Sequence, residues 1–402
     1  MSDIVVVGAG QAGSALVVKL RNLGFEGGIT LVGEEVVPPY QRPPLSKKYL
    51  LGEMALERLF LRPESFYLDN GIALELGRAA VTIDRKDKAV IVDGRRIAYD
   101  RLALTTGAVP RRLPDAIGGG LEGVHTVRTL IDVDAVAPEF VAGRRVLIVG
   151  GGYIGLEAAA VAAARGLKVT LVEKADRILQ RVAAAETSDY FRMLHKRHGV
   201  DLREGVGLQR LTGDGRVTGA ELDDGSWLEL DFVIVGVGIA PATRLAESAG
   251  LTIDNGIAVD ETGRTSDPAI WAAGDCASFP RNGERIRLES VQNAIDQAEN
   301  VAENMLGAGK PYDPHPWFWS DQYDVHLQIA GLNTGYDRVH VRPGADGAQS
   351  HWYYSGDRLL AVDAINDARA YMIGKRLLAA GRSPAPGVVT NPATDLKALL
   401  KA

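Results

Sequence analysis

The chain has 402 residues, of which 46% are hydrophobic and 24% are charged, a composition typical of a soluble globular protein with two or three domains. Its formal charge of −6 gives no electrostatic reason to expect nucleic acid as a partner. No apolar run is long enough to cross a bilayer, and the single cysteine, Cys276, excludes an internal disulfide, a redox cysteine pair and a cysteine-rich metal site. The chain starts without a signal peptide, so we expect a cytoplasmic protein with no metal and no membrane contact.

Residues 4–34 carry the first recognisable unit, a dinucleotide-binding fingerprint in its full context. A short apolar strand over 4–7 is followed by glycines in G-x-G-x-x-G spacing, a helix, a second apolar strand and an acid. The glycines allow a tight turn, close approach of a pyrophosphate and helix packing, and the acid accepts hydrogen bonds from ribose hydroxyls. These residues are Gly8, Gly10, Gly13 and Glu34.

A proline-stiffened loop over 38–48 follows. We expect Ser46 to cap a short helix that bears Lys47 and Lys48. A lysine held this way beside a nucleotide fold is either a cofactor contact or a solvated surface residue, and the pattern leaves both open.

Residues 80–107 predict short strands. The Asp93-Gly94 pair predicts a hairpin. The strand over 102–104 ends at Thr105-Thr106-Gly107, where small residues let the backbone approach a ligand.

The fingerprint repeats over residues 145–174, with an alanine-rich helix between two strands. We therefore expect two bound dinucleotides that face each other. The repeated residues are Gly150, Gly152, Gly155 and Glu173.

Glu173 bears on the choice of nicotinamide cofactor. An acid here favours the free 2′-hydroxyl of NAD and repels the 2′-phosphate of NADP. Lys174 and Arg177 lie nearby and leave a phosphate-binding alternative open, but the sequence favours NADH.

The second half predicts further strands over 200–238, a buried strand over 270–273 followed by Asp275, and a helix over 289–306. Acids at strand ends in open α/β sheets lie where ligands bind, although Asp275 could also be a simple turn residue or helix cap. From Pro311 the chain becomes rich in proline and aromatic residues. Four strand-like runs and a helical tail then predict a third, smaller α+β domain. The runs lie at 326–330, 338–342, 351–354 and 359–363.

These segments resemble, over essentially the whole chain, the FAD-dependent ferredoxin reductases of oxygenase systems, which share the glutathione reductase fold. The resemblance rests on YQRPPLSK at 40–47, TTG at 105–107, VGGGYIGLE at 149–157, TSDP…GDC at 265–276, ESVQNA at 289–294 and PWFWSDQ at 316–322.

The resemblance implies an α/β fold with two Rossmann-like domains of the glutathione reductase type and a C-terminal α+β domain. Residues 1–107 and 240–312 would bind FAD, 108–239 would bind NAD, and 313–402 would cover the flavin edge. The implied FAD contacts are Gly8, Gly10, Ala12, Gly13, Glu34, Lys47, Ala80, Arg128, Asp275 and Val291.

NADH would lie on the second fold. Glu157 would approach the nicotinamide and pair with Lys47, although an acid in the first turn of a helix is also a common stabilising residue. The implied NAD contacts are Gly150, Gly152, Tyr153, Ile154, Gly155, Glu173 and Gly238.

The implied reaction is hydride transfer from NADH to flavin, followed by single-electron transfer to a transiently bound 2Fe-2S ferredoxin. Trp317 and Trp319 are either core residues or, for one of them, part of the electron route, which we assign to Trp319. Arg281, Arg285 and Arg287 are candidates for docking an acidic ferredoxin, although a solvated charged loop explains them more simply. The sequence leaves open the ferredoxin, the terminal oxygenase, and whether the protein is a monomer or a weak dimer.

Other assignments differ in partner or class. A rubredoxin reductase or a small diaphorase would have a similar sequence. A signalling flavoprotein of the apoptosis-inducing-factor type would want an extra basic or targeting segment, which we do not find. Disulfide reductases need paired cysteines, and peroxide- or oxygen-reducing relatives usually carry one cysteine after the proline loop, whereas residues 38–53 have none.

Overall fold

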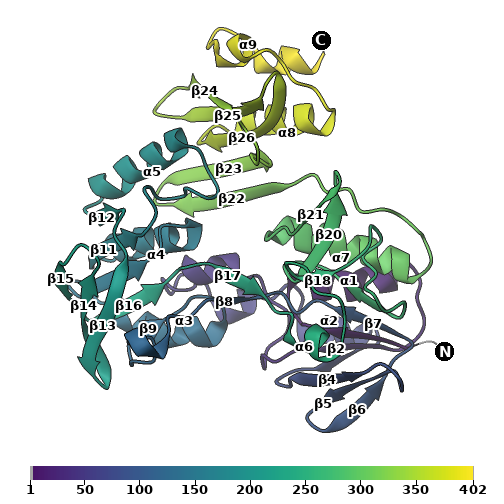
Figure 1. Ribbon diagram of the computed structural model, residues 1–402. Helices are drawn as coiled ribbons and strands as arrows, with labels where there is room; N and C mark the ends of the chain where they lie inside the picture. Colours follow the sequence, from purple (N-terminus) through teal and green to yellow (C-terminus); the bar gives the residue numbers. More distant parts are fainter. Residues whose placement is uncertain (1–2, 402) are drawn as a thin grey trace. The chain divides into compact units, whose positions relative to one another are not determined.

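The computed structural model describes residues 3–401 (Figure 1). Contacts divide the described residues into two compact units. Unit 1 consists of residues 1–42, 54–109 and 239–314. Unit 2 consists of residues 43–53, 110–238 and 315–402. Unit 2 therefore contains both the second fingerprint and the C-terminal strands, while the three-domain division stays a prediction.

The centre of unit 1 is a five-stranded parallel sheet with strand order β19-β7-β1-β2-β3. Its strands are apolar on both faces, as expected for a parallel sheet covered on two sides. Helices α1 and α7 pack against each other and share one core cluster with β1 and β2. The bounds are β1 Ile4–Val7, α1 Gln11–Asn22, β2 Ile29–Val32, β3 Ile72–Glu75, β7 Arg101–Leu104, β19 Ile270–Ala272 and α7 Val291–Met305.

Smaller sheets and helices complete unit 1. The hairpin expected at Asp93-Gly94 is confirmed, with both residues at positive φ. The remaining elements are α2 Glu64–Asp69, β4 Ala80–Asp84, β5 Ala89–Val92, β6 Arg95–Ala98, β8 Ala108–Pro110, β17 Ile239–Pro241, α6 Arg244–Ser248, β18 Ile257–Ala258, β20 Ala277–Arg281 and β21 Glu284–Ile286.

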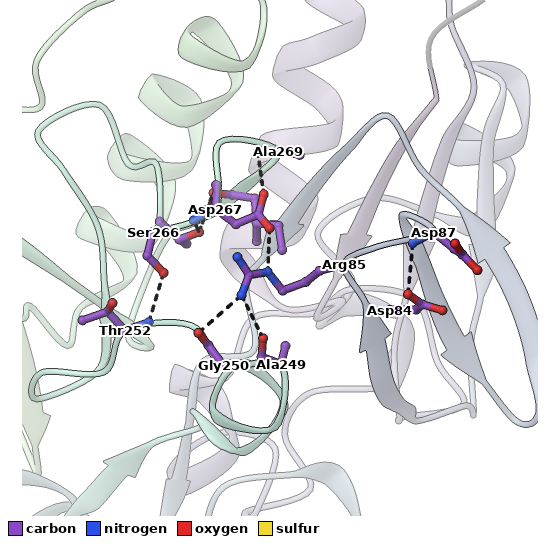
Figure 2. A network of polar contacts seen from close by, with 11 residues as sticks. Asp84, Arg85, Asp87, Ala249, Gly250, Thr252, Ser266, Asp267 and Ala269 are labelled. Carbon is purple, nitrogen blue, oxygen red and sulfur yellow. Dashed lines mark hydrogen bonds and ion pairs between the residues drawn. The ribbon is translucent and has the colours of Figure 1, made fainter.

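Arg85, directly after β4, ties three segments of unit 1 together (Figure 2). Its Nε donates to Asp267 Oδ2 at 2.6 Å, and its Nη1 donates to the carbonyls of Ala249 and Gly250 beyond α6. Asp267 also accepts from the amide of Ala269, just before β19. The guanidinium thus holds the hairpin sheet and the end of α6 to the segment that leads into β19.

Unit 2 has its own five-stranded parallel sheet, with strand order β12-β11-β10-β16-β9. The sequence did not predict two of its helices, α3 and α5. The N-cap of α3, Thr129, forms a capping box with Asp132. The bounds are β9 Val124–His125, α3 Leu130–Val136, β10 Arg145–Val149, α4 Tyr153–Ala164, β11 Lys168–Glu173, α5 Ala185–Arg197, β12 Asp201–Glu204, β13 Leu208–Asp214, β14 Arg216–Leu222, β15 Trp227–Glu229 and β16 Phe232–Val235.

The C-terminal part of unit 2 is an antiparallel sheet with strand order β22-β23-β26-β25-β24, covered by α8. The four expected strands are present. The PWFWSDQ segment forms a further strand, the edge strand β22, whose residues pair in register with β23. In the sequence this segment stands out only for its prolines and aromatic residues, which did not predict a strand. The bounds are β22 Trp317–Gln322, β23 Val325–Gly331, β24 Arg338–Pro343, β25 Gln349–Ser355, β26 Arg358–Ile365, α8 Ala368–Ala379 and α9 Pro386–Thr390.

One local expectation is wrong. Ser46 is not the cap of a helix that bears Lys47; it is the last residue of a 3₁₀ helix over Pro43–Ser46, and Lys47 lies in the following turn. The Ser46 hydroxyl donates to the carboxylate of Glu157 instead. Across residues 3–401, no helix is both long and apolar enough to cross a bilayer.

Candidate functional sites

The first glycine loop has the geometry of a pyrophosphate cradle. Gly8 has φ +115°, and a Cβ on it would lie 2.2 Å from the Thr105 carbonyl oxygen. A Cβ on Gly13 would lie 2.0 Å from the Gly8 carbonyl oxygen. By contrast, a Cβ on Gly10 would meet no described atom within 4 Å. Gly10, directly before α1, therefore leaves room for a ligand to approach the backbone, as the sequence predicts.

The second loop repeats this arrangement in unit 2. Gly150 has φ +108°, with a Cβ position 2.4 Å from the Gly236 carbonyl oxygen, and a Cβ on Gly155 would lie 2.0 Å from the Gly150 carbonyl oxygen. A Cβ on Gly152 would again meet no described atom within 4 Å. Both loops therefore fit a dinucleotide pyrophosphate, and each ligand would be held by backbone amides at a helix N-terminus.

The two acids after the second strands have different surroundings. Glu173 Oε2 accepts from the Gly151 amide at 2.7 Å, and Oε1 accepts from the Ala175 amide at 2.8 Å. Glu34 is exposed, and its neighbour Glu35 pairs with Arg42 at 2.7 Å. Only the second acid is thus fixed on its own glycine loop.

The two basic residues near Glu173 differ in whether their side chains are free to contact a 2′-phosphate. Arg177 Nη1 donates to Ser188 Oγ at 2.5 Å, so its guanidinium is engaged within the protein. Lys174 is exposed. Of the two basic residues, only Lys174 is therefore left as a candidate contact for the 2′-phosphate of NADPH.

Three further predicted NAD contacts lie in unit 2. Tyr153 begins α4, and its ring centroid lies 5.0 Å from that of Phe318. Burial, followed by the charges of Asp363 and Tyr353, raises the pKa of Tyr153 well above its usual value. Ile154 is exposed, and the Gly238 carbonyl accepts from the Arg111 amide at 2.9 Å.

The remaining predicted FAD contacts are divided between the units. In unit 1, Ala12 lies in α1, Ala80 begins β4, Val291 begins α7 and Asp275 follows β19. The Asp275 carbonyl accepts from Arg287 at 3.1 Å. Arg128 belongs to unit 2. It lies just before α3, and its amide donates to Asp132 Oδ2 in the first turn of that helix.

Unit 2 also contains the pair that the resemblance implied. Lys47 Nζ lies 3.1 Å from Glu157 Oε1 and 3.5 Å from Asp321 Oδ2. The Glu157 carboxylate accepts from Ser46 Oγ at 2.9 Å and from Ser320 Oγ at 2.8 Å. Three donors thus compensate a carboxylate that is 4% exposed, as a buried charge requires.

Sequence reasoning missed both serines as site residues. Each lies in a quoted motif, Ser46 in YQRPPLSK and Ser320 in PWFWSDQ. Ser320 lies one residue after Trp319 on β22, so its side chain points to the opposite face of the strand. Recognition of β22 as a strand would have indicated that Ser320 faces away from the two tryptophans, because successive side chains of a strand point to opposite faces.

The two tryptophans of β22 lie side by side, with ring centroids 5.6 Å apart. Lys375 Nζ lies 4.7 Å from the ring centroid of Trp317, a cation–π contact. Both rings are partly buried, and Trp317 packs against the core of the C-terminal sheet. The electron-route assignment of Trp319 stays a prediction.

The arginines offered as docking residues are used inside unit 1. Arg281 donates to the Pro314 carbonyl, Arg285 to the carbonyls of Val259 and Ser278, and Arg287 to that of Asn255. They tie backbone segments together, so the expectation of a solvated charged loop is wrong.

Cys276 is fully buried, and burial raises the pKa of its thiol. A protonated buried thiol is unreactive. Among residues 3–401 no group of three or more His, Cys, Asp or Glu side chains could hold a metal ion.

Comparisons with known proteins agree with this geometry. Residues 2–298 match the family described as pyridine nucleotide-disulphide oxidoreductase, and residues 317–400 match the reductase C-terminal family. The chain is 46% identical to a ferredoxin–NAD(P)(+) reductase from Sphingomonas sp, over 98% of this chain and 97% of the relative. It is 40% identical to putidaredoxin reductase from Pseudomonas putida, over 100% and 97%.

The chain belongs to the ferredoxin reductases of the pyridine nucleotide-disulphide oxidoreductase family. A solved structure titled as the covalent putidaredoxin reductase–putidaredoxin complex matches with a TM-score of 0.96 and 40% identity, covering 100% of this chain and 98% of that one. The predicted fold class, the family and the assignment as an oxidoreductase are thereby confirmed. In this ferredoxin reductase the family name does not imply a disulfide, because the only cysteine is the buried Cys276.

Proposed function

We propose that this ferredoxin reductase holds FAD in unit 1, binds NADH in unit 2 and passes electrons singly to a 2Fe-2S ferredoxin that serves an oxygenase. The observation that carries the proposal is the pair of cradles at Gly10 and Gly152, each open where a pyrophosphate would approach. The names of the relatives support a ferredoxin partner and a nicotinamide cofactor, and the matched family supports FAD. The FAD and NAD contact residues remain those that the resemblance implies.

When bound, FAD supplies the hydride acceptor and the capacity to release electrons one at a time. The protein's own task is to orient the nicotinamide at a near-attack distance, roughly 3–3.5 Å between the reacting atoms. A positive Lys47 near the flavin would stabilise negative charge that develops on the ring. Glu157, paired with Lys47 at 3.1 Å, would hold the lysine until NADH enters.

Glu173 selects the nicotinamide in this proposal. Its two oxygens are held by the Gly151 and Ala175 amides, so the negative charge is fixed at the loop. A fixed charge repels the 2′-phosphate of NADPH and favours NADH.

We also infer a cytoplasmic protein, since the sequence has no cysteine pair that could form the stabilising disulfides typical of exported proteins. Cell fractionation with antibody detection tests this inference. Recovery mainly with periplasmic or membrane markers would contradict it.

The test of the proposed function is an anaerobic rapid-mixing experiment. The yellow protein is mixed with NADH or NADPH, and then with an oxidised 2Fe-2S ferredoxin. We expect NADH to bleach the flavin much faster than NADPH and ferredoxin to restore the colour. Bleaching without reoxidation by ferredoxin would overturn the partner, and equal rates with both nicotinamides would overturn the role of Glu173.

A further inference from the structure

Glu157 is the end of a longer line of buried polar groups in unit 2. Ser320 Oγ, 2.8 Å from Glu157 Oε1, lies 3.2 Å from Gln322 Nε2. Gln322 Oε1 lies 2.8 Å from His195 Nε2, and His195 Nδ1 lies 3.3 Å from the Tyr323 hydroxyl. Ser320, Gln322 and His195 are at most 1% exposed. We call Tyr323, His195, Gln322 and Ser320 the relay.

The donors and acceptors of the relay fit together in only one direction. Ser320 has one hydroxyl proton, and an ionised Glu157 can only accept, so Ser320 donates to the carboxylate and accepts from Gln322. The Gln322 amide must then present its nitrogen to Ser320 and its oxygen to His195. A flipped amide would leave the single proton of Ser320 between two acceptors.

The same constraint fixes the state of His195. Its Nε2 must carry a proton to donate to Gln322. Because burial lowers the pKa of His195 to about 4, the ring is neutral near pH 7 and its Nδ1 accepts from the Tyr323 hydroxyl. His198, stacked on the Tyr323 ring with centroids 3.7 Å apart, is a titratable neighbour on the same helix end.

From this geometry we propose that the relay is a positioning device for the Lys47–Glu157 pair: four donors aligned head to tail hold Glu157 as an ionised acceptor turned toward Lys47. Hydrogen bonds in such a line polarise one another. Lys47 and Asp321, which also pairs with Lys47 at 3.5 Å, are the other charged groups at this end. The proposal rests on the proposed function, in which the pair acts during flavin reduction by NADH.

The relay links three elements that the sequence separates. His195 comes from α5, Ser320 and Gln322 from β22, and Glu157 from α4. Ser320 and Gln322 lie two residues apart and therefore point to the same face of the strand. The arrangement thus gives the C-terminal sheet a direct role at the second dinucleotide fold.

A double-mutant cycle on the FAD-loaded protein tests whether Ser320 acts through Glu157. We expect Ser320→Ala to slow flavin reduction by NADH about tenfold, the change expected from one hydrogen bond to a charged group, and Ser320→Thr to restore most of the rate. In a Glu157→Gln background, Ser320→Ala should have little further effect. Equal losses in both backgrounds would overturn the proposal.

Ser278→Ala is the matched control. Ser278 is a fully buried serine of unit 1 whose hydroxyl has no partner among the described residues. Removal of its hydroxyl should leave the rate unchanged. A tenfold loss here would show that loss of any buried hydroxyl slows the reaction, which would also overturn the specific role of Ser320.

The direction of the relay has a readout independent of activity. ¹⁵N NMR of histidine-labelled protein, assigned with a His195→Gln variant, should show His195 as the neutral Nε2–H tautomer at pH 6. The Nδ1–H tautomer or a protonated ring would overturn the relay. If NADH fails to bleach the wild-type flavin, the proposed function fails, while the tautomer still decides the direction of the relay.

Discussion

The two dinucleotide folds have the same glycine geometry but different surroundings. Each first glycine has a positive φ, each third glycine packs on the carbonyl of the first, and each middle glycine is open. In unit 2 the acid is fastened to its own loop, while in unit 1 the exposed Glu34 is not. The repeated glycines thus give the same backbone geometry in both units, while the acid that ends each fingerprint is held differently.

Alanine substitution of Gly10 or Gly152 should have the largest effect, because each should weaken the binding of a different dinucleotide. A Cβ at Gly10 or Gly152 meets no described atom, so we expect the fold to persist while the ligand is displaced. Gly10→Ala should weaken FAD binding, and Gly152→Ala should weaken NAD⁺ binding, each by about 1–3 kcal/mol, which is on the order of 5- to 150-fold. Calorimetric titration of each variant with both ligands measures this. Equal loss of both ligands in either variant would break the distinction between the cradles.

The two units should also respond differently to acid. In unit 2, burial lowers the pKa values of His195 and His351 to about 4, so the stability they contribute above pH 6.5 is lost as the pH falls toward 4. Burial raises the pKa of Asp363 to about 6, so the cost of burying this ionised carboxyl decreases as the pH falls through 6. The two histidines outweigh Asp363, and unit 2 should lose roughly 2 kcal/mol of unfolding free energy between pH 7 and 5.

In unit 1 the lowered carboxyl pKa values, those of Asp84, Asp267 and Glu303, lie below the ordinary range. Their contribution is lost only as the pH falls further, below about 4. Hydrogen exchange at pH 7 and pH 5, corrected for intrinsic rates, measures each unit separately. An equal loss of protection in unit 1 would contradict this difference.

Substitution of Glu173 and of Glu34 should affect the choice between NADH and NADPH differently. Glu173→Gln keeps an acceptor for the Gly151 amide but removes the charge, so the NADH-over-NADPH ratio of kcat/KM should fall about tenfold. Glu34→Gln, the counterpart in unit 1, should leave that ratio unchanged. Steady-state kinetics with both nicotinamides measures it. A similar fall in both variants would point to a general loss of negative charge.

The smallest effect should follow from loss of the Arg85 contacts drawn in Figure 2, and it should appear in the stability of unit 1. Arg85→Ala removes the pair with Asp267 and two donations to carbonyls after α6. Because the Arg85 side chain is 38% exposed, we expect a loss of only about 1 kcal/mol, confined to unit 1. Urea unfolding measures the loss. Destabilisation of unit 2 by the same amount would show that the units do not unfold independently.

Much of the fold could be predicted because apolar strands, glycine spacing and turn residues are local signals. The strands of both fingerprints and the Asp93-Gly94 hairpin are examples. The sequence reading missed β22 because three large aromatic residues next to prolines obscure the alternation of a strand. It misplaced Ser46 because its partner, Glu157, is 111 residues away, and capping rules describe only local bonds.

The site could be predicted only in part. Backbone cradles follow from glycine spacing, and the Lys47–Glu157 pair followed from the resemblance. Ser320, Gln322 and His195 could not be found, since their bonds join α4, α5 and β22 and no local pattern encodes that junction. Arg281, Arg285 and Arg287 were misjudged for the same reason, because their carbonyl partners depend on tertiary structure.

Binding stoichiometry distinguishes the two cradles most directly. The chain freed of its nucleotides is titrated with FAD, and the FAD-loaded chain is then titrated with NAD⁺, with heat and released flavin followed together. We expect one FAD to bind per chain, followed by one NAD⁺ that displaces no flavin. Displacement of FAD by NAD⁺, or a chain that binds only one dinucleotide, would contradict the assignment of different ligands to the two cradles.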